Sequence, residues 1–365
     1  MNITIIGSNG FIGSNLSLSL EDESSFEKLF KITTKSPRKE LKTAINSSEI
    51  VINLAGVNRS KSDDDFIDVN VNFAREIATM VSKSPKTQKL LYASSAHAGR
   101  DDIYGKTKFQ GEEAVKEILK KTNKEYLIER FPGIFGKNCK PYYNSVVATF
   151  CYNIANGKEN IIDDPSAEIN ICYIDDVIAY IRKRITRQDK EIKLEPVYSI
   201  RVGDLDSKIK LIANSENFIP DMGCSLTKKL HATYLFYKKP NDFVTDLIVH
   251  EDIRGSFSEI VKTEKGGQFS FVTANPGQKR GVHYHHTKTE KFLVLSGKAI
   301  FKQKNLFTGE VYEFFLDSDT PKTIDSIPGH VHSIENVGDE KLIAVIWCNE
   351  IFDKDNPDTF FREMT

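Results

Sequence analysis

The first two hundred residues alternate between two hydrophobic patterns. Short apolar runs rich in β-branched residues predict strands, namely ITIIG (3–7), IVINLAG (50–56), LLYASS (90–95) and YLIERFPGIFG (126–136). Longer amphipathic stretches between them, among them residues 65–82 and 106–121, predict helices. Such alternation is typical of α/β proteins whose helices connect parallel strands. We therefore predict a doubly wound parallel sheet for this part of the chain.

The pattern changes after Phe243. Short alternating runs separated by Gly, Pro and Asp predict many strands: FSEIV (257–261), QFSFVTANPG (268–277), FLVLSGKAIFKQKN (292–305), VYEFFLD (311–317) and KLIAVIWCNE (341–350). The lysine-rich segment 204–240 is helical in pattern at first and loses that pattern near Pro240. We therefore predict two domains, an α/β domain over residues 1–243 and an all-β domain over residues 244–365.

Composition excludes several protein classes. Lys and Arg number 50 and Asp and Glu 51, so the net charge of −1 produces no long-range field that would attract nucleic acid or an anionic membrane. No stretch reaches the roughly 18 apolar residues of a membrane span, and the first residues lack the basic segment of a signal peptide. The five cysteines have no CxxC spacing, which favours reduced, buried thiols. We expect a cytoplasmic protein with no nucleic-acid or membrane partner.

Three glycines at GxxGxxG spacing lie between the first predicted strand and the first predicted helix. Glycines in this position allow a tight turn and a close backbone approach to a pyrophosphate, which the start of the helix stabilises. A tight turn without a ligand is the alternative. The pattern predicts a Rossmann-like dinucleotide site, with the candidate residues Gly7, Asn9, Gly10, Phe11, Ile12 and Gly13.

The segment 31–38, KITTKSPR, follows the expected second strand and has no carboxylate to bind the ribose 2′-hydroxyl of NAD. Basic side chains there suit a 2′-phosphate. We therefore expect NADPH as the cofactor, with Lys35 and Arg38 near the phosphate. Ordinary solvated loop charges are the alternative reading of these two residues.

Two further strand ends carry residues suited to redox chemistry. Small residues in the segment Leu54, Ala55 and Gly56 would let a cofactor approach. Ser95 ends another predicted strand, and Tyr104 and Lys108 follow at i, i+4 spacing, which places them on one helix face. A nearby ammonium lowers the pKa of a phenol, so we expect Tyr104 to exchange a proton near neutral pH.

These segments resemble the extended, sugar-nucleotide-modifying branch of the short-chain dehydrogenase/reductase superfamily over residues 1–200. The resemblance also includes FPGIFG (131–136) and YIDDV (173–177), which in that branch lie around the sugar nucleotide. It implies that Tyr104 donates a proton to a carbonyl oxygen that Ser95 positions. It also implies that Lys108 binds the nicotinamide ribose and tunes Tyr104. Arg130 and Asn144 are guesses at substrate contacts.

Five of the eight histidines lie between residues 283 and 332. His283 and His285 have the i, i+2 spacing that points two side chains to one face of a strand. Glu290 and His332 complete a possible cradle of three imidazoles and one carboxylate, a ligand set that suits several divalent metals. Packing or hydrogen-bonding histidines without a metal are the alternative.

This two-part pattern resembles the cupin superfamily over residues 245–365, although Pro328 directly precedes Gly329 where the usual pattern leaves a gap. The resemblance implies a cupin barrel with a divalent metal, Zn²⁺ as first choice, on His283, His285, Glu290 and His332. Segments 250–257 and 279–284 are also similar to dTDP-keto-sugar 3,5-epimerases. In those enzymes the histidine that corresponds to His283 is the base. A metal-bound His283 cannot fill that role, and His330, Asp325 and Tyr284 are weak substitutes.

In this pairing the whole chain resembles bacterial capsular-polysaccharide enzymes that make UDP-2-acetamido-2,6-dideoxy-L-talose on the path to N-acetyl-L-fucosamine. The resemblance implies C3 epimerisation of a UDP-linked 4-keto-6-deoxy-N-acetylhexosamine in the cupin, then NADPH-dependent reduction at C4, in a homodimer. A reductase with a structural or dimerising cupin is the main alternative. A nucleotide-sensing scaffold and an isomerase or dehydratase with tightly bound NAD are further ones. The metal could also be purely structural.

Overall fold

The computed structural model describes residues 1–21, 26–186, 192–214 and 218–364. The chain divides into two compact units: unit 1 comprises Met1–Lys210 and Lys229–Lys238, and unit 2 comprises Leu211–Lys228 and Lys239–Thr365. The domain boundary after Phe243 remains a prediction. Within the segment 204–240, residues 215–217 lie outside the described residues.

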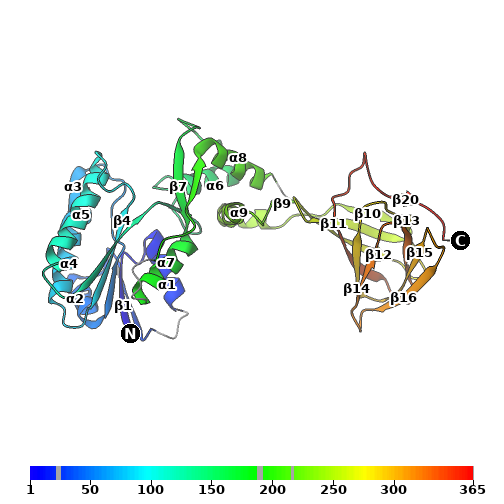
Figure 1. Ribbon diagram of the computed structural model, residues 1–365, viewed down its shortest axis with the longest axis horizontal. Coiled ribbons are helices and arrows are strands. Elements are labelled where there is room, and N and C mark those ends of the chain that lie inside the picture. Colours follow the sequence, from blue (N-terminus) through cyan, green and yellow to red (C-terminus); the bar gives the residue numbers. More distant parts are fainter. Residues whose placement is uncertain (22–25, 187–191, 215–217, 365) are drawn as a thin grey trace. The chain divides into compact units, whose positions relative to one another are not determined.

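A five-stranded parallel sheet forms the centre of unit 1, in the order β2-β1-β3-β4-β5 (Figure 1). Its strands are β1 (Asn2–Ile6), β2 (Lys28–Ile32), β3 (Ile50–Asn53), β4 (Lys89–Ser95) and β5 (Glu125–Phe131). The order reverses between β1 and β3, and in such sheets ligands bind at the carboxyl ends of the strands beside that reversal. The predicted Rossmann-like parallel sheet is confirmed.

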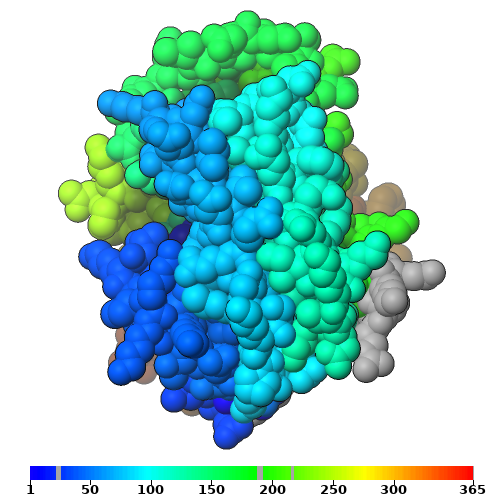
Figure 2. All heavy atoms as spheres, turned by 90° about the vertical axis from the view of Figure 1, so that its left-hand side faces the viewer, coloured from blue at the N-terminus to red at the C-terminus, as the bar shows by residue number. Residues whose placement is uncertain are grey.

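Helices cover both faces of this sheet. One face packs against α1 (Phe11–Glu21) and α7 (Ile174–Thr186) through an apolar core that includes Ile5 and Ile178. The other face packs against α2 (Arg38–Ser47), α4 (Ala74–Lys83) and α5 (Ile103–Leu119), and Figure 2 views unit 1 from this side. The helix α3 (Asp63–Phe66) continues into α4 through a π-helix, η1 (Ile67–Phe73).

A small sheet and several further helices follow β5 in the sequence. A small sheet has the order β6-β7-β8, with β6 (Gly133–Phe135), β7 (Glu168–Tyr173) and β8 (Tyr198–Arg201). The other elements are α6 (Val146–Ala155), α8 (Val202–Ala213), α9 (Ser225–Tyr237) and the 3₁₀-helix η2 (Pro240–Phe243). Among the described residues, every helix is too short or too polar to cross a bilayer. Among the described residues, which include all five cysteines, no disulfide is present, and four of the cysteines are buried, as predicted.

Two mainly antiparallel sheets pack face to face in unit 2, which we call the β domain. The first has the order β10-β11-β12-β19-β14-β17, with β9 paired to β11, and the second has the order β16-β15-β18-β13-β20. Their shared core includes Phe292 from the first sheet and Phe301 and Ile334 from the second. The predicted β architecture is therefore confirmed, whereas closure into a cupin barrel remains a prediction. The strand bounds are β9 (Phe218–Ile219), β10 (Val249–Asp252), β11 (Gly255–Thr263), β12 (Gly267–Ala274), β13 (Lys279–Tyr284), β14 (Glu290–Ser296), β15 (Lys298–Asn305), β16 (Val311–Asp317), β17 (Thr323–Ser326), β18 (His330–Asn336), β19 (Leu342–Cys348) and β20 (Phe360–Phe361).

Candidate functional site

The glycine turn joins β1 to α1. Gly7 has a φ of +82°, and a Cβ atom on Gly13 would lie 2.1 Å from the carbonyl oxygen of Gly7, so no larger residue fits there. Asn9, Gly10, Phe11 and Ile12 span the turn and the first residues of α1. A helix start that follows a tight glycine turn presents backbone N–H groups to an anion. The turn therefore has the geometry that a dinucleotide pyrophosphate requires.

Lys35 and Arg38, the residues predicted to contact the 2′-phosphate of NADPH, lie just after β2. Lys35 is exposed, and its backbone N–H donates to Thr33 Oγ1 over 3.2 Å. Arg38 begins α2 and forms an ion pair of 2.9 Å with Glu76, while its guanidinium lies 4.9 Å from the centre of the Phe73 ring. Glu76 would compete with a cofactor phosphate for Arg38. The roles of Lys35 and Arg38 in NADPH recognition remain predictions.

The segment after β3 lies beside the glycine turn. A Cβ atom on Gly7 would lie 3.0 Å from the backbone nitrogen of Ala55 and 3.1 Å from the carbonyl carbon of Leu54. On its other side, a Cβ atom on Gly56 would lie 3.6 Å from Lys108 Nζ. The fold thus brings the predicted cofactor residues and the predicted catalytic lysine to one edge of the sheet.

The predicted catalytic trio is assembled at the end of β4 and the start of α5. Asp102 caps α5 by accepting a hydrogen bond of 2.7 Å from the backbone N–H of Gly105, which places Tyr104 in the first turn. The Ser95 side chain lies close enough to the Tyr104 hydroxyl to lower its pKa. One turn later, the buried Nζ atom of Lys108 donates to the carbonyl oxygen of Ala93 over 2.7 Å.

The expected lowering of the Tyr104 pKa is not found. Burial raises the pKa of Tyr104 above its ordinary value, and the nearby Ser95 side chain offsets this only in part. Burial also lowers the pKa of Lys108 to about 8, because its ammonium has little contact with water. Lys108 Nζ donates to the carbonyl oxygen of Ala93 and not to the phenol, so the i, i+4 spacing does not by itself lower the Tyr104 pKa.

Asn70 is a buried polar residue at this edge that sequence reasoning missed. It lies in the π-helix η1, and its side chain exchanges two hydrogen bonds of 3.0 Å with the backbone of Val57. It also donates to Thr107 Oγ1 over 3.3 Å, and a Cβ atom on Gly56 would lie 3.4 Å from its Oδ1. Asn70 therefore links the loop after β3 to α5. Only its place in an otherwise amphipathic stretch could have drawn attention to it.

The two guessed substrate contacts differ in their surroundings. Arg130 forms two hydrogen bonds, of 2.8 and 2.7 Å, with the buried carboxylate of Glu112, which also accepts from Ser94 over 2.5 Å. This pairing holds β4, β5 and α5 together and gives Arg130 a structural role. Asn144 is exposed just before α6. A substrate contact by either residue remains a prediction.

The β domain brings the four predicted metal ligands together. His283 comes from β13, His285 follows that strand, Glu290 begins β14 and His332 comes from β18. One donor atom from each residue lies within 4.8 Å of the others. The Nε2 atoms of His285 and His332 lie 3.3 and 3.0 Å from Glu290 Oε2.

The outer atoms of three of these side chains have partners. His285 Nδ1 lies 2.5 Å from the carbonyl oxygen of Asp358, and His332 Nδ1 lies 2.8 Å from Ser326 Oγ. Glu290 Oε1 accepts from the thiol of Cys348 over 3.4 Å. Outer partners of this kind orient metal ligands in proteins.

Two of the donor atoms that face the centre of the cluster have no hydrogen-bond partner among the described residues. Among the described residues, His285 Nε2 and Glu290 Oε2 are buried and form no properly angled hydrogen bond. Burial, followed by the neighbouring His332, lowers the pKa of His283 to about 3, which keeps this imidazole neutral with a free lone pair. Burial opposes ionisation of Glu290, but His285 and His332 outweigh it and hold the pKa of Glu290 well below its usual range. This donor set fits a divalent metal.

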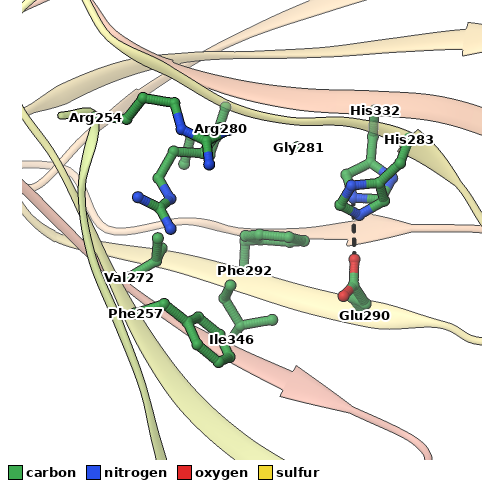
Figure 3. A pocket seen from close by; sticks show the side chains of 11 residues that line it. Arg254, Phe257, Val272, Arg280, Gly281, His283, Glu290, Phe292, His332 and Ile346 are labelled. Atoms are coloured by element: carbon green, nitrogen blue, oxygen red, sulfur yellow. Dashed lines mark ion pairs between the residues drawn. The ribbon is translucent and has the colours of Figure 1, made fainter. Parts of the chain in front are cut away.

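The cluster opens onto a cavity of about 280 Å³. Arg254 and Arg280 line it apart from the histidines, and Phe292 lies between the two groups (Figure 3). Asp252 pairs with Arg254 over 2.5 Å and with Arg280 over 3.4 Å. The cavity therefore combines two cations, an apolar wall and three of the four cluster residues, His283, Glu290 and His332.

None of the three substitute bases lies among the residues that line this cavity. Asp325 is exposed and pairs with Lys291, and the Tyr284 ring packs against Phe360. The His330 Nδ1 atom lies 3.2 Å from the carbonyl oxygen of Pro328. The structure thus gives no support to any of them as the proton acceptor.

Comparison with known proteins adds two family matches. Residues 3–200 match the NAD dependent epimerase/dehydratase family, and residues 250–360 match the polysaccharide biosynthesis C-terminal domain. The UDP-2-acetamido-2,6-beta-L-arabino-hexul-4-ose reductase of Pseudomonas aeruginosa is 38% identical over 99% of this chain and 98% of its own length.

Solved structures show the same similarity. The capsular polysaccharide assembling protein CapF from Staphylococcus aureus matches with a TM-score of 0.91 and 35% identity, over 100% of both chains. The UDP-glucuronic acid 4-epimerase from Bacillus cereus, solved in complex with NAD, shares the fold over 65% of this chain and 96% of that chain, with 18% identity and a TM-score of 0.56. From the match over residues 3–200 and the 38% identity over nearly the whole length, this chain belongs to the NAD dependent epimerase/dehydratase family.

Proposed function

We propose that this chain is a bifunctional, cytoplasmic sugar-nucleotide enzyme that makes a capsular-polysaccharide precursor. Its β domain epimerises C3 of UDP-2-acetamido-2,6-dideoxy-4-keto-hexose, and unit 1 then reduces the C4 ketone to give UDP-2-acetamido-2,6-dideoxy-L-talose. The observation that carries the reductase step is that β4 ends at Ser95 and the first turns of α5 carry Tyr104 and Lys108, with Lys108 close to the loop that adjoins the glycine turn. The 38% identity to a relative named as a UDP-hexul-4-ose reductase supports a 4-keto substrate.

The reduction uses groups already aligned in unit 1. NADPH, when bound along the glycine turn, supplies a hydride to C4. Ser95 holds the carbonyl oxygen by a hydrogen bond, and Tyr104 donates the proton that this oxygen needs as the hydride arrives. Lys108, whose Nζ would lie 3.6 Å from a Cβ atom on Gly56, binds the nicotinamide ribose in this proposal.

The epimerisation needs a proton to leave C3 and another to return on the opposite face. A divalent metal, Zn²⁺ in our proposal, held by His283, His285, Glu290 and His332 in a cupin barrel, supplies positive charge close to the negative charge that develops at the ketone. Phe292 and the other apolar residues of the cavity exclude water and strengthen such interactions.

The arginines of the cavity support an anionic substrate. Arg254 and Arg280 bring two positive charges, and Asp252 neutralises only one of them. A guanidinium binds phosphate oxygens in a bidentate manner. The remaining charge suits a substrate that carries a diphosphate, as a UDP-sugar does.

A reductase whose β domain only dimerises is the second candidate function. Strand β16 lies at the edge of its sheet and exposes Val311, Phe314 and Phe315. An exposed apolar edge strand is a suitable surface for pairing with another copy. We propose a homodimer under both functions.

The two candidates are separated by following the keto-sugar in deuterium oxide by NMR. Purified protein without NADPH should introduce deuterium at C3, and added NADPH should then reduce C4. Reduction of a pre-epimerised ketone without any C3 exchange would leave a reductase with a structural β domain. Exchange that continues after the metal is removed by chelation would exclude a catalytic role for the metal.

A further inference from the structure

The last strand of the chain lies beside the strand that carries His283. Phe361 pairs with His283 and Phe360 with Tyr284 in the antiparallel ladder between β20 and β13. The backbone N–H of Arg362 also donates to the carbonyl oxygen of Val282 over 3.2 Å. The C-terminal segment is therefore attached to one side of the four-residue cluster.

Asp358, just before β20, binds the loop that joins His285 to Glu290. Its Oδ1 accepts from the backbone N–H of His286 over 2.8 Å, and its Oδ2 accepts from those of Thr287 and Lys288 over 2.9 and 2.8 Å. The Thr287 hydroxyl adds a fourth hydrogen bond of 3.0 Å. One carboxylate thus fixes three consecutive residues of a loop whose two ends are cluster residues.

The backbone of Asp358 contacts the cluster directly. Its carbonyl oxygen lies 2.5 Å from His285 Nδ1, so the ring turns Nε2 towards Glu290 and His332. Asp358 has a φ of +40°, a conformation that a residue with a Cβ atom adopts only where the surroundings hold it. Lys288 Nζ secures the same segment by donating to the carbonyl oxygen of Pro357 over 2.8 Å.

We propose that Asp358 is a positioning residue for the metal cluster. Its carboxylate sets the course of the loop 286–288, and its carbonyl group sets the orientation of His285, so that the inner donor atoms converge on one point. This inference rests on the proposed metal site. Asp358 lies 68 positions beyond Glu290 in the sequence, so its role is evident only from its hydrogen bonds to the loop and to His285.

The test measures metal affinity directly. Full-length protein freed of metal is titrated with Zn²⁺ in competition with a chromophoric chelator, for wild type, Asp358→Ala and Asp358→Asn. Loss of a residue that orients a metal ligand typically weakens metal binding about 10–100-fold, and we expect a loss in this range for Asp358→Ala. Asp358→Asn keeps one acceptor oxygen and should lose less. Asp353→Asn is the matched control, because Asp353 lies in the same segment and accepts only from Asp355 within it.

A second readout separates positioning from simple stabilisation. The visible absorption bands of bound Co²⁺ report ligand geometry, so they should change in Asp358→Ala and stay as in wild type in Asp353→Asn. If Asp358→Ala does not fold, Thr287→Val removes one hydrogen bond to Asp358 and should still weaken Zn²⁺ binding to a smaller extent. Wild-type protein that binds no Zn²⁺ would overturn the metal site itself. Equal affinity and equal spectra in wild type and Asp358 variants would overturn only the role of Asp358.

Discussion

Lys108 donates a hydrogen bond of 2.7 Å from its buried ammonium group to the carbonyl oxygen of Ala93 at the end of β4. Burial lowers the Lys108 pKa from 10.5 to about 8. Between these two pH values the folded chain binds fewer protons than the unfolded chain, so this residue's contribution to stability rises as the pH rises.

Lys108→Met should therefore change stability in a pH-dependent manner. The free energy of unfolding of wild type minus that of Lys108→Met should increase from pH 8 to pH 10.5, by at most about 3 kcal/mol. Urea unfolding of cofactor-free protein at several pH values measures this difference. Lys106→Met, at an exposed position of the same helix, should show no such trend, and a flat profile for Lys108→Met would contradict the prediction.

Tyr104→Phe should abolish reduction and spare epimerisation. The phenol is the proton donor in our proposal, and general acid catalysis typically contributes about 10²–10⁴-fold in rate. NADPH oxidation followed by absorbance, together with deuterium exchange at C3 followed by NMR, measures the two steps. Loss of both activities in a folded variant would show that the two units do not hold separate reaction sites.

Arg38→Ala should weaken the binding of NADPH more than the binding of NADH. Hydrogen bonds to charged groups contribute about 1.5–3 kcal/mol, so loss of a phosphate contact should raise the KM for NADPH about tenfold or more. Glu76→Gln should act in the opposite direction, because Glu76 holds Arg38 in an ion pair of 2.9 Å. Steady-state kinetics with both cofactors measures the effect. Equal changes for NADPH and NADH would show that Arg38 does not contact the 2′-phosphate.

His285→Ala should lose the metal and, with it, C3 exchange. Reduction of an already epimerised ketone should continue, since the reductase trio lies in the other unit. His286→Ala is the matched control, because its ring packs against Tyr284 and Phe360 outside the cluster. Metal content by elemental analysis and exchange by NMR are the measurements. A metal-free His285→Ala protein that still exchanges C3 would refute the proposed role of the metal.

The sequence predicted those features that depend on local spacing. The strand-turn-helix pattern around Gly7 and Gly13 is local, and the structure contains it where expected. The pairing of His283 with His285 followed from the two-residue period of a strand, although the structure adds a bulge between Gly281 and His283. The return of His332 to the same point follows from no periodicity; it was predicted from the clustering of five histidines and from the resemblance to the cupin pattern.

Features that depend on long-range packing were missed. Asn70 reads as one polar position of an amphipathic helix, and only its burial against Val57 and Thr107 reveals its role. Asp358 lies in a segment without a hydrophobic pattern, so no periodicity connects it to His285. The expected effect of Lys108 on the Tyr104 pKa also failed, because burial of both groups and the partner at Ala93 were not visible in the spacing.

The π-helix η1 limits how the chain can change in length at this point. A π-helical turn contains one residue more than the regular helix that surrounds it. Deletion of one residue from Ile67–Phe73 would let the segment close into a regular helix with the flanking turns facing nearly as before, because a π-helix accommodates the extra residue in a wider turn. Asn70 lies in that wider turn, and its hydrogen bonds to Val57 and Thr107 would be lost with it. Natural or engineered variants of this chain should therefore tolerate a deletion in the loop before Ser62 far better than a deletion in η1.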